Sequence, residues 1–259
     1  MLAVERQMVL VDSLRQNPVL AVEDLARRFR VSAQTVRRDL QYLEREGLIR
    51  RTRGGAVAHD QDALSPEHAF TARELEDAAQ KRAIAATALA LVEPGSTVIM
   101  DASTTVLYLA RALPRDIELN VVVNALPVNM ELCARARVGV TMLGGTMRPT
   151  SLSATGPTAE ATLRCYFADT AFISARGLSL ERGLTEASAS ESALKEIMVA
   201  NAARVIALVD ARKLGRTAFT FVAPLSAIDV LITDDSVDPR MVERLRETGL
   251  DVRVARTSP

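Results

Sequence analysis

Hydrophobic and polar positions in the first part of the chain recur in a pattern of short helices. Residues 5–16 carry an apolar stripe that Pro18 ends, because the residue before a proline avoids the helical conformation. Residues 22–29 predict a second helix, with acidic residues in its first turn and arginines in its last, as the helix dipole favours. After a short turn, Ser32 is a good N-cap for a third helix that runs to about residue 46, and Gly47 can end it.

The third predicted helix divides its residues between two faces. Val36, Leu40 and Leu43 recur at helical spacing and predict the buried face. The opposite face carries amide and guanidinium donors, which suit phosphates and base edges in the major groove of DNA. These outward residues are Gln34, Arg37, Arg38, Gln41 and Arg45.

A basic hairpin follows this helix. Residues 48–53 predict a strand, Gly54-Gly55 a turn, and residues 56–58 a return strand. Three short helices and a basic hairpin describe a winged helix-turn-helix, whose third helix enters the major groove. The alternative is a small helical bundle whose arginines only face solvent. The tight turn, the serine cap, the basic face and the basic hairpin occur in order, which favours DNA binding.

From residue 79 onward, helical and strand patterns alternate. Continuous Val, Ile and Leu runs predict buried strands, and the alternation predicts an α/β domain with a mostly parallel sheet. Strands are expected at 97–100, 119–123, 138–143, 170–174, 204–209, 229–233 and 252–255, with helices at about 79–92, 106–113, 188–202 and 239–247.

The stretch between the two patterns is acidic and irregular at first, and a helix restarts near Thr71. We therefore expect a DNA-binding domain at 1–58, a linker at 59–78 and a second domain at 79–259. His59 and His68 fall in the linker and are interpreted as solvated residues.

Polar residues recur where the predicted strands of the second domain end, and ligands of open α/β sheets bind at the carboxyl ends of strands. Three hydroxyl residues at the start of a helix offer donors to an anion, and Gly144-Gly145 allows close backbone approach. The chain has three lysines against 29 arginines, and Lys195 and Lys213 both fall near this site. The candidate effector site comprises Asp101, Ser103, Thr104, Thr105, Asn124, Gly144, Gly145, Lys195, Asp210 and Lys213.

Each of these features has a plainer interpretation. The Ser-Thr-Thr run could be only an N-cap, and Gly-Gly only a turn. Lys195 could be a solvated partner of Glu191, four residues earlier on the same helix. The convergence of several such features at strand ends favours a site for a phosphorylated small molecule.

Composition excludes several other functions. The 259 residues are 48% hydrophobic and 25% charged, which is ordinary for a globular protein. Two histidines and two isolated cysteines argue against a metal site, a disulfide framework and Ser-His or Cys-His catalysis. Neither GxGxxG nor a P-loop is present, so no dinucleotide or nucleotide cofactor is expected. No signal peptide or apolar membrane span is evident, which favours a cytoplasmic protein without membrane partners.

Charge is unevenly distributed along the chain. The formal net charge is zero, but residues 1–58 hold 11 arginines, no lysine and seven acidic residues, a net charge of +4. The remainder therefore carries −4. A basic domain joined to an acidic one predicts an anionic partner for the first domain only.

Three motifs in the first domain resemble those of a known family, the DeoR family of bacterial transcription factors. The run 31–40, VSAQTVRRDL, followed by Gly47-Leu-Ile-Arg50 and by Arg53-Gly-Gly-Ala56, is similar to the signature of its DNA-binding domain. One departure is Arg53, where the family usually has histidine. The resemblance and the outward face together assign DNA contacts to Ser32, Gln34, Thr35, Arg37, Arg38, Gln41, Arg50 and Arg53.

The resemblance extends over residues 73–235, which look like the family's sensor domain. It implies a fold similar to ribose-5-phosphate isomerase and a sugar phosphate as the ligand. Ser103 and Arg212 depart from the family pattern, which could alter the sugar that is accepted.

The expected function is that of a DNA-binding regulator, more often a repressor of a carbohydrate operon, that a phosphorylated sugar releases from its operator. A dimer or tetramer is expected, because such domains usually bind paired half-sites. The first alternative is a sugar-phosphate isomerase with a DNA-binding tail, in which Asp101, Asp210 and Lys213 would move protons. The second is an interaction module that binds protein or RNA.

Overall fold

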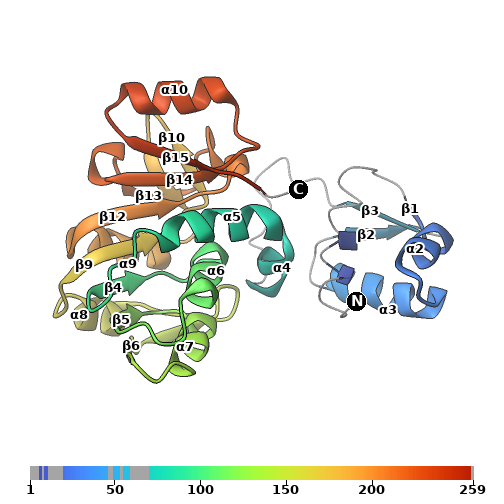
Figure 1. Cartoon of the computed structure of the whole chain (residues 1–259), viewed down its shortest axis with the longest axis horizontal. Coiled ribbons are helices and arrows are strands. Elements are labelled where there is room, and N and C mark those ends of the chain that lie inside the picture. The colour runs from blue at the N-terminus through green and yellow to red at the C-terminus, as the bar shows by residue number, and fades with distance from the viewer. Residues whose placement is uncertain are drawn as a thin grey trace. The chain divides into compact units, whose positions relative to one another are not determined.

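The computed structural model describes residues 6–7, 9–10, 20–45, 49–52, 55–58 and 70–257, with only the backbone at 20, 45, 49–52 and 55–58. The chain divides into two compact units, Met1–Ala78 and Ala79–Pro259, which we call the head and the body. Figure 1 shows the elements of both units.

The head contains short helices and a small antiparallel sheet. Its described elements are β1 (Leu20–Ala21), α2 (Val22–Phe29), α3 (Ala33–Arg45), β2 (Ile49–Thr52), β3 (Gly55–Ala58) and α4 (Phe70–Leu75). The sheet order is β1-β3-β2, and β2 pairs with β3 in the register of a tight hairpin. This confirms the predicted second and third helices and the hairpin.

Several predicted features of the head fall outside the described residues. Of the predicted first helix, only 6–7 and 9–10 are described, and these are helical. Gly47, the hairpin turn at 53–54, and both histidines lie outside the described residues. The two-residue strand β1 was not predicted, because two residues are too few to show a period.

The head is held together by one apolar cluster and a buried ion pair. Leu25, Val36 and Leu40 lie in the cluster, as predicted for the inner faces of their helices. Asp39, next along α3, is also buried, and its carboxylate accepts hydrogen bonds from Arg6 Nε at 2.6 Å and Gln7 Nε2 at 3.1 Å. Asp39 therefore holds the N-terminal segment against α3, while its neighbours on the other side of the helix face outward.

The body is built on a seven-stranded sheet in which every pairing is parallel, which confirms the predicted α/β class. Its order is β15-β14-β12-β9-β4-β5-β6. The strands are β4 (Thr97–Met100), β5 (Leu119–Val123), β6 (Val138–Met142), β9 (Ala168–Ile173), β12 (Ala202–Leu208), β14 (Val230–Asp234) and β15 (Asp251–Ala255).

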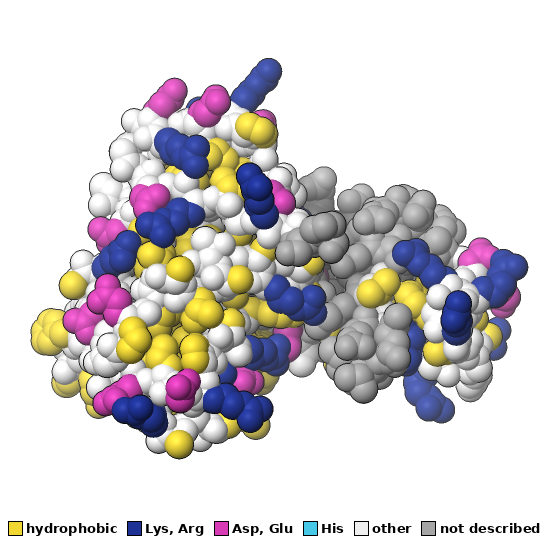
Figure 2. All heavy atoms as spheres, viewed as in Figure 1, with side chains coloured by type: hydrophobic (Ala, Val, Ile, Leu, Met, Phe, Trp, Pro, Cys, Tyr) yellow, Lys and Arg dark blue, Asp and Glu magenta, His cyan; other side chains and the backbone are white. Residues whose placement is uncertain are grey.

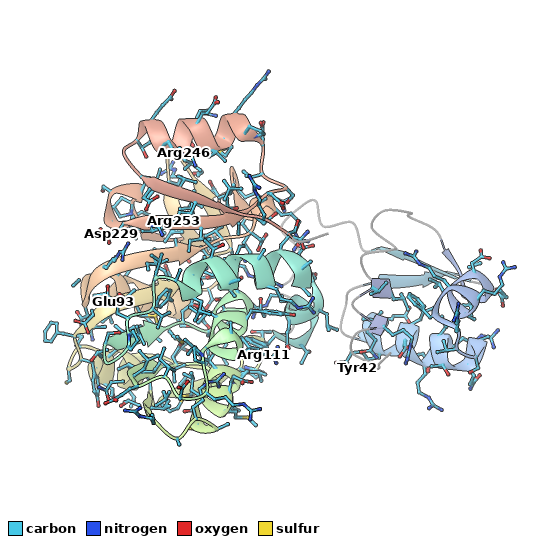
Figure 3. All side chains as sticks on the ribbon, in the orientation of Figure 1. Tyr42, Glu93, Arg111, Asp229, Arg246 and Arg253 are labelled. Atoms are coloured by element: carbon cyan, nitrogen blue, oxygen red, sulfur yellow. The ribbon has the colours of Figure 1, made fainter. Side chains whose placement is uncertain are left out.

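Helices cover both faces of this sheet. They are α5 (Ala78–Leu89), α6 (Thr104–Ala112), α7 (Leu126–Cys133), α8 (Pro157–Leu163), α9 (Ala189–Ala200) and α10 (Pro239–Glu247), with 3-10 turns at Ala211–Lys213 and Leu225–Ala227. In Figure 1, α5, α6 and α7 lie in front of the sheet, and α9 lies behind it. Arg246 of α10 donates to the carbonyl oxygen of Val252 in β15 at 2.8 Å, which attaches that helix to the last strand (Figure 3).

Two small sheets stand on the carboxyl-end side of the large one. The first is the hairpin of β7 (Thr146–Arg148) and β8 (Ser153–Thr155), and the second has the order β10-β11-β13, from β10 (Gly177–Ser179), β11 (Gly183–Glu186) and β13 (Thr220–Ala223). Their strands are three or four residues long, so the sequence pattern did not predict them. Within the described ranges, no helix is long and apolar enough to cross a membrane.

Candidate functional site

The candidate nucleic-acid surface of the head is the outward face of α3. Ser32 Oγ accepts a hydrogen bond from the backbone N–H of Thr35 at 3.1 Å, so Ser32 caps the helix as predicted. The exposed residues of this face are Ser32, Gln34, Arg37, Arg38 and Gln41, with Thr35 half-buried. Figure 2 shows arginine side chains standing out from the described surface of the head.

The wing residues are described less fully. Arg50 lies on β2, where only the backbone is described, and Arg53 lies outside the described residues. Their contacts with DNA therefore stay a prediction, as do those of the α3 face.

The candidate effector residues of the body lie where parallel strands end, at one edge of the sheet. Asp101 follows β4, Asn124 follows β5, and Asp210 follows β12. Gly144-Gly145 follows β6, and the hydroxyl run 103–105 begins α6. Since the carboxyl ends of parallel strands share an edge, the topology gathers four separate chain segments on one side of the body.

Asp101 is the most connected of these residues. Its carboxylate is fully buried and accepts the backbone N–H groups of Ser103, at 3.0 Å, and Ser174, at 2.8 Å. Oδ2 also lies 3.0 Å from Lys195 Nζ. Asp101 thus joins the ends of β4 and β9 to the start of α6 and the middle of α9.

Lys195 lies on α9 with 5% of its surface exposed. Its ammonium donates to the carbonyl oxygen of Ser174 and to Glu186 Oε2, both at 2.7 Å. Burial alone would lower the pKa of Lys195, but the carboxylates of Asp101 and Glu186 outweigh burial and raise that pKa above its ordinary value. The plainer interpretation, a solvated pair with Glu191, is therefore wrong, because Lys195 is buried and bonded to other groups.

Asp210 and Lys213 form a second ion pair at the same edge. Lys213 Nζ lies 2.9 Å from Asp210 Oδ2, and Arg212 Nε lies 3.8 Å from Oδ1. Burial would raise the pKa of Asp210, but Lys213, Arg212 and Lys81 together lower it to about 2. The carboxylate is therefore ionised at neutral pH, and Lys213 is already positioned by it.

The hairpin of β7 and β8 connects the remaining candidates. Asn124 Nδ2 donates to the carbonyl oxygen of Ala154 at 3.2 Å. Gly145 has a φ of +134°, and a Cβ built there would lie 2.6 Å from the carbonyl oxygen of Thr155. Two residues before Thr155 on β8, the hydroxyl of Ser153 donates to Glu191 of α9 at 2.5 Å. These contacts link β5 and the Gly-Gly turn to α9, the helix that carries Lys195.

Polar side-chain atoms without hydrogen-bond partners are concentrated at this edge of the sheet. Among the described residues they include atoms at the ends of β14, β9 and β5 and in the first turn of α6, the helix that follows β4. They are Thr233 Oγ1, Ser174 Oγ, Asn124 Oδ1 and Thr105 Oγ1, while the nearby carboxylate of Asp210 is ion-paired with Lys213. Buried polar groups in native proteins nearly always have partners, so these are the atoms to which a bound molecule would form hydrogen bonds.

The part of the chain that the structure describes contains no group of three or more His, Cys, Asp or Glu residues arranged to hold a metal ion. The carboxylates of the cluster are instead paired with lysine ammonium groups.

Comparison with known proteins identifies the family. Residues 6–62 match the DeoR-like helix-turn-helix domain, and residues 76–235 match the DeoR C terminal sensor domain. The chain belongs to the DeoR family of transcriptional regulators. Both assignments agree with the resemblance that the sequence motifs indicate.

Relatives match over nearly the whole chain. The uncharacterized HTH-type transcriptional regulator YulB of Bacillus subtilis is 35% identical over 97% of this chain and 96% of its own. The putative aga operon transcriptional repressor of Escherichia coli O157:H7 is 32% identical over 96% of this chain and 92% of its own. Ribose 5-phosphate isomerase a of Methanocaldococcus jannaschii shares 18% identity over 52% of this chain and 53% of its own, with a TM-score of 0.39.

The structure adds residues that the sequence reasoning on this DeoR-family chain missed. Lys81, on α5, is 2% exposed and close enough to lower the pKa of Asp210, so all three lysines of the chain lie at this site. The scarcity of lysine could have revealed it. Glu186 and Glu191 were missed because neither directly follows a strand of the large sheet, which was the signal that selected candidates.

Replacing each glycine of the Gly-Gly turn by alanine should change the free energy of unfolding by different amounts. Gly145→Ala introduces a Cβ against the Thr155 carbonyl at a positive φ, and should lower the free energy of unfolding by about 1–3 kcal/mol. Gly144→Ala is the matched control, because its Cβ would meet nothing closer than Thr158 Cγ2 at 4.0 Å. Urea unfolding of the two variants checks this, and equal stabilities would contradict the assigned geometry.

Proposed function

We propose that this DeoR-family chain is a cytoplasmic repressor whose body binds a phosphorylated sugar and whose head then releases its operator. The unpartnered polar atoms at the ends of β14, β9 and β5 and in the first turn of α6 carry the proposal for the body. A polyhydroxyl ligand with an anionic group would supply donors and acceptors to these atoms. The exposed basic face of α3 supports the proposal for the head.

The phosphate is proposed to bind at the N-terminus of α6. The first backbone N–H groups of a helix have no partner within it, and they favour an anion. Ser103 Oγ accepts the N–H of Val106 at 3.1 Å, which leaves the N–H groups of Thr104 and Thr105 to the phosphate. Thr105 Oγ1 supports this placement, because it is fully buried and has no hydrogen-bond partner.

The effector is proposed to act by preferring the arrangement of the protein that does not bind DNA. A ligand with equal affinity for both arrangements would shift nothing, however tightly it binds. Linkage then requires that operator DNA weaken effector binding by the same factor. A dimer or tetramer is proposed as the active form, because one chain carries one head and such heads bind paired half-sites.

We infer that the body does not turn its ligand over. A general base, which an aldose isomerase uses, is most effective when its pKa lies near the working pH. The pKa of Glu186 lies below its ordinary value, because Lys195 outweighs the effect of burial, and the pKa of Asp210 is about 2. Both carboxylates are therefore weak bases at pH 7. Incubation with ribose 5-phosphate should give no ketose by coupled assay or NMR, and catalytic turnover would favour the isomerase alternative.

Arg37 and Arg38 should carry much of the operator affinity. Replacing an arginine that contacts a base should cost about 1–3 kcal/mol and relax specificity, whereas losing a phosphate contact weakens all sequences equally. The measurement is the affinity of Arg37→Ala/Arg38→Ala for operator and for unrelated duplex. Arg240→Ala/Arg244→Ala, which removes the same charge from exposed positions on α10, is the control and should bind normally. A folded head variant with unchanged affinity would refute the assignment.

Thr105→Asp should give a protein that binds operator but no longer responds to effector. The new carboxylate would stand where the phosphate should bind, and like charges repel. Asn120→Asp adds the same charge at an exposed position at the amino end of β5, on the opposite edge of the sheet, and should respond normally. The affinity of each variant for operator DNA, measured with and without the inducing metabolite, distinguishes Thr105→Asp from Asn120→Asp. Normal release of Thr105→Asp would show that the phosphate is held elsewhere.

A further inference from the structure

Two phenylalanine side chains on one short strand of the body face solvent. Phe219, just before β13, is 85% exposed, and Phe221, the second residue of β13, is 53% exposed. The chain has six phenylalanines and no tryptophan, and Phe29, Phe70 and Phe172 are buried. Exposed aromatic side chains that stand together are typical of protein–protein contacts, so this strand is a candidate interaction surface.

The body holds β13 in place, so the ring of Phe221 cannot fold inward. Side chains alternate across a strand, and Val222, the next residue, packs into the apolar core. Ser192 of α9 donates a hydrogen bond to the carbonyl oxygen of Phe221, and Thr220 Oγ1 donates to the carbonyl oxygen of Glu186 at 2.8 Å. Rings on a strand that is already rigid lose little freedom when a partner covers them, which favours association.

The surface beside the rings is made of small side chains. Because Ser192 contacts β13, the face of α9 that includes Ser192 lies next to this strand. Ala189 and Ala193 share that face at helical spacing, and Ala189 is exposed while Ala193 is half-buried. The body therefore presents projecting rings beside a shallow strip of helix. We call this the β13–α9 surface, which comprises Phe219, Phe221, Ala189 and Ala193.

The β13–α9 surface has the features that an interface between two copies of this chain requires. A two-fold interface uses the same patch on both copies, so the patch must be complementary to itself. Here the rings of one copy can pack on the small side chains of the other. The border of the surface carries both signs of charge, with Glu196 exposed on α9 and Arg182 exposed in the turn before β11, which meets the end of β13 at Ala223. A mixed border lets opposite charges meet across the axis, whereas nucleic acid or an anionic membrane selects one sign.

The area of the rings is appropriate for such an interface. A buried aromatic side chain removes about 150–250 Å² from water, and a stable protein interface needs roughly 1,200–2,000 Å² in total. At their present exposures, the four rings of a two-fold pair would contribute roughly 400–700 Å², about a third of that total. The helix surface that the rings cover adds a comparable area, which brings the total to the lower part of that range.

We propose that two copies of the chain associate through the β13–α9 surface, with Phe219 and Phe221 of each copy packed on α9 of the other. This inference rests on the proposed function, which requires more than one head for paired half-sites, and it assigns that association to one surface of the body. α9 also carries Lys195, so one helix contributes both to the interface and to the buried ion cluster.

The test measures the molar mass of the full-length protein by sedimentation or light scattering over a range of protein concentrations. Wild type should form a dimer or tetramer. Phe219→Ser/Phe221→Thr should dissociate to a smaller species, with a dissociation constant raised about 100-fold or more, because each pair loses four buried rings and a single central aromatic often contributes tenfold or more. Threonine favours strands, so β13 should be retained.

Three further variants separate the interface from general effects of surface changes. Phe167→Ser removes a ring that is 78% exposed just before β9, at the amino edge of the large sheet, and should leave the mass unchanged. Ala189→Arg keeps both rings but adds a long charged side chain to the strip, so it should dissociate the protein. Ala86→Arg places the same side chain at an exposed position on α5, on the other side of the sheet from α9 (Figure 1), and should keep the wild-type mass.

Each result supports or overturns the assignment. Dissociation of both β13–α9 variants with native circular dichroism, and unchanged masses for the two controls, would support it; dissociation of a control would overturn it. If Phe219→Ser/Phe221→Thr does not fold, Ala189→Arg decides. If wild type is oligomeric and Ala189→Arg keeps its mass, the copies associate elsewhere, so the inference is wrong and the proposed function stands. A wild type that is monomeric at every concentration, with and without operator DNA, would refute the proposed oligomer as well.

Discussion

The ammonium group of Lys195 lies where water barely reaches, and a buried charge is stable only when it is paired and hydrogen-bonded. Its partners come from the ends of β4 and β9 and from β11, while Lys195 itself comes from α9. One charge therefore fixes four elements relative to one another. Removing Asp101 or Glu186 would leave the buried Lys195 with one carboxylate contact in place of two, so both acidic residues contribute to holding these elements together.

The distribution of lysine and arginine along the chain is consistent with this requirement that a buried cation be paired and hydrogen-bonded. Arginine supplies 29 of the 32 basic residues, and most of its described side chains are exposed. The three lysines all lie at the strand ends of the body. A compact ammonium on a flexible stem can be enclosed by several oxygen atoms at once, whereas the planar guanidinium suits two-pronged contacts with phosphates or base edges. The basic residues of the head and of the body thus serve different tasks.

The sequence pattern was sufficient for features with a repeating signal. The buried faces of α2 and α3 and the seven parallel strands were predictable from helical spacing and from continuous apolar runs. The candidate residues Asp101, Asn124 and Asp210 were predictable because a polar residue directly follows a buried strand. The partner of each residue was not predictable from the sequence. Asp101 and Lys195, for example, are 94 positions apart, and only the order of the strands brings them together.

The other candidate residues were not predicted, mainly because they lie on very short strands. The β7–β8 hairpin and the β10-β11-β13 sheet have strands of three or four residues, yet they carry Ser153 and Glu186. Short strands show no period, so residues on them are found only when the tertiary structure is known. Lys81 was missed for another reason. It lies in the first turn of an alanine-rich helix, where a lysine is usually solvated, and its burial became evident only in the structure.

The unpartnered polar atoms at the strand ends would connect the stability of the body to the binding of the proposed effector. A buried polar atom that lacks every partner, water included, costs about 1–3 kcal/mol, and the large apolar core of the body would offset such a cost. A ligand that satisfies these atoms recovers part of it, so binding stabilises the body by an amount that grows with ligand concentration. A body that binds its ligand in only one arrangement converts this gain into a preference for that arrangement. Under the proposed function, the atoms that a bound metabolite would satisfy are thus the same atoms through which it would shift the equilibrium on which operator binding depends.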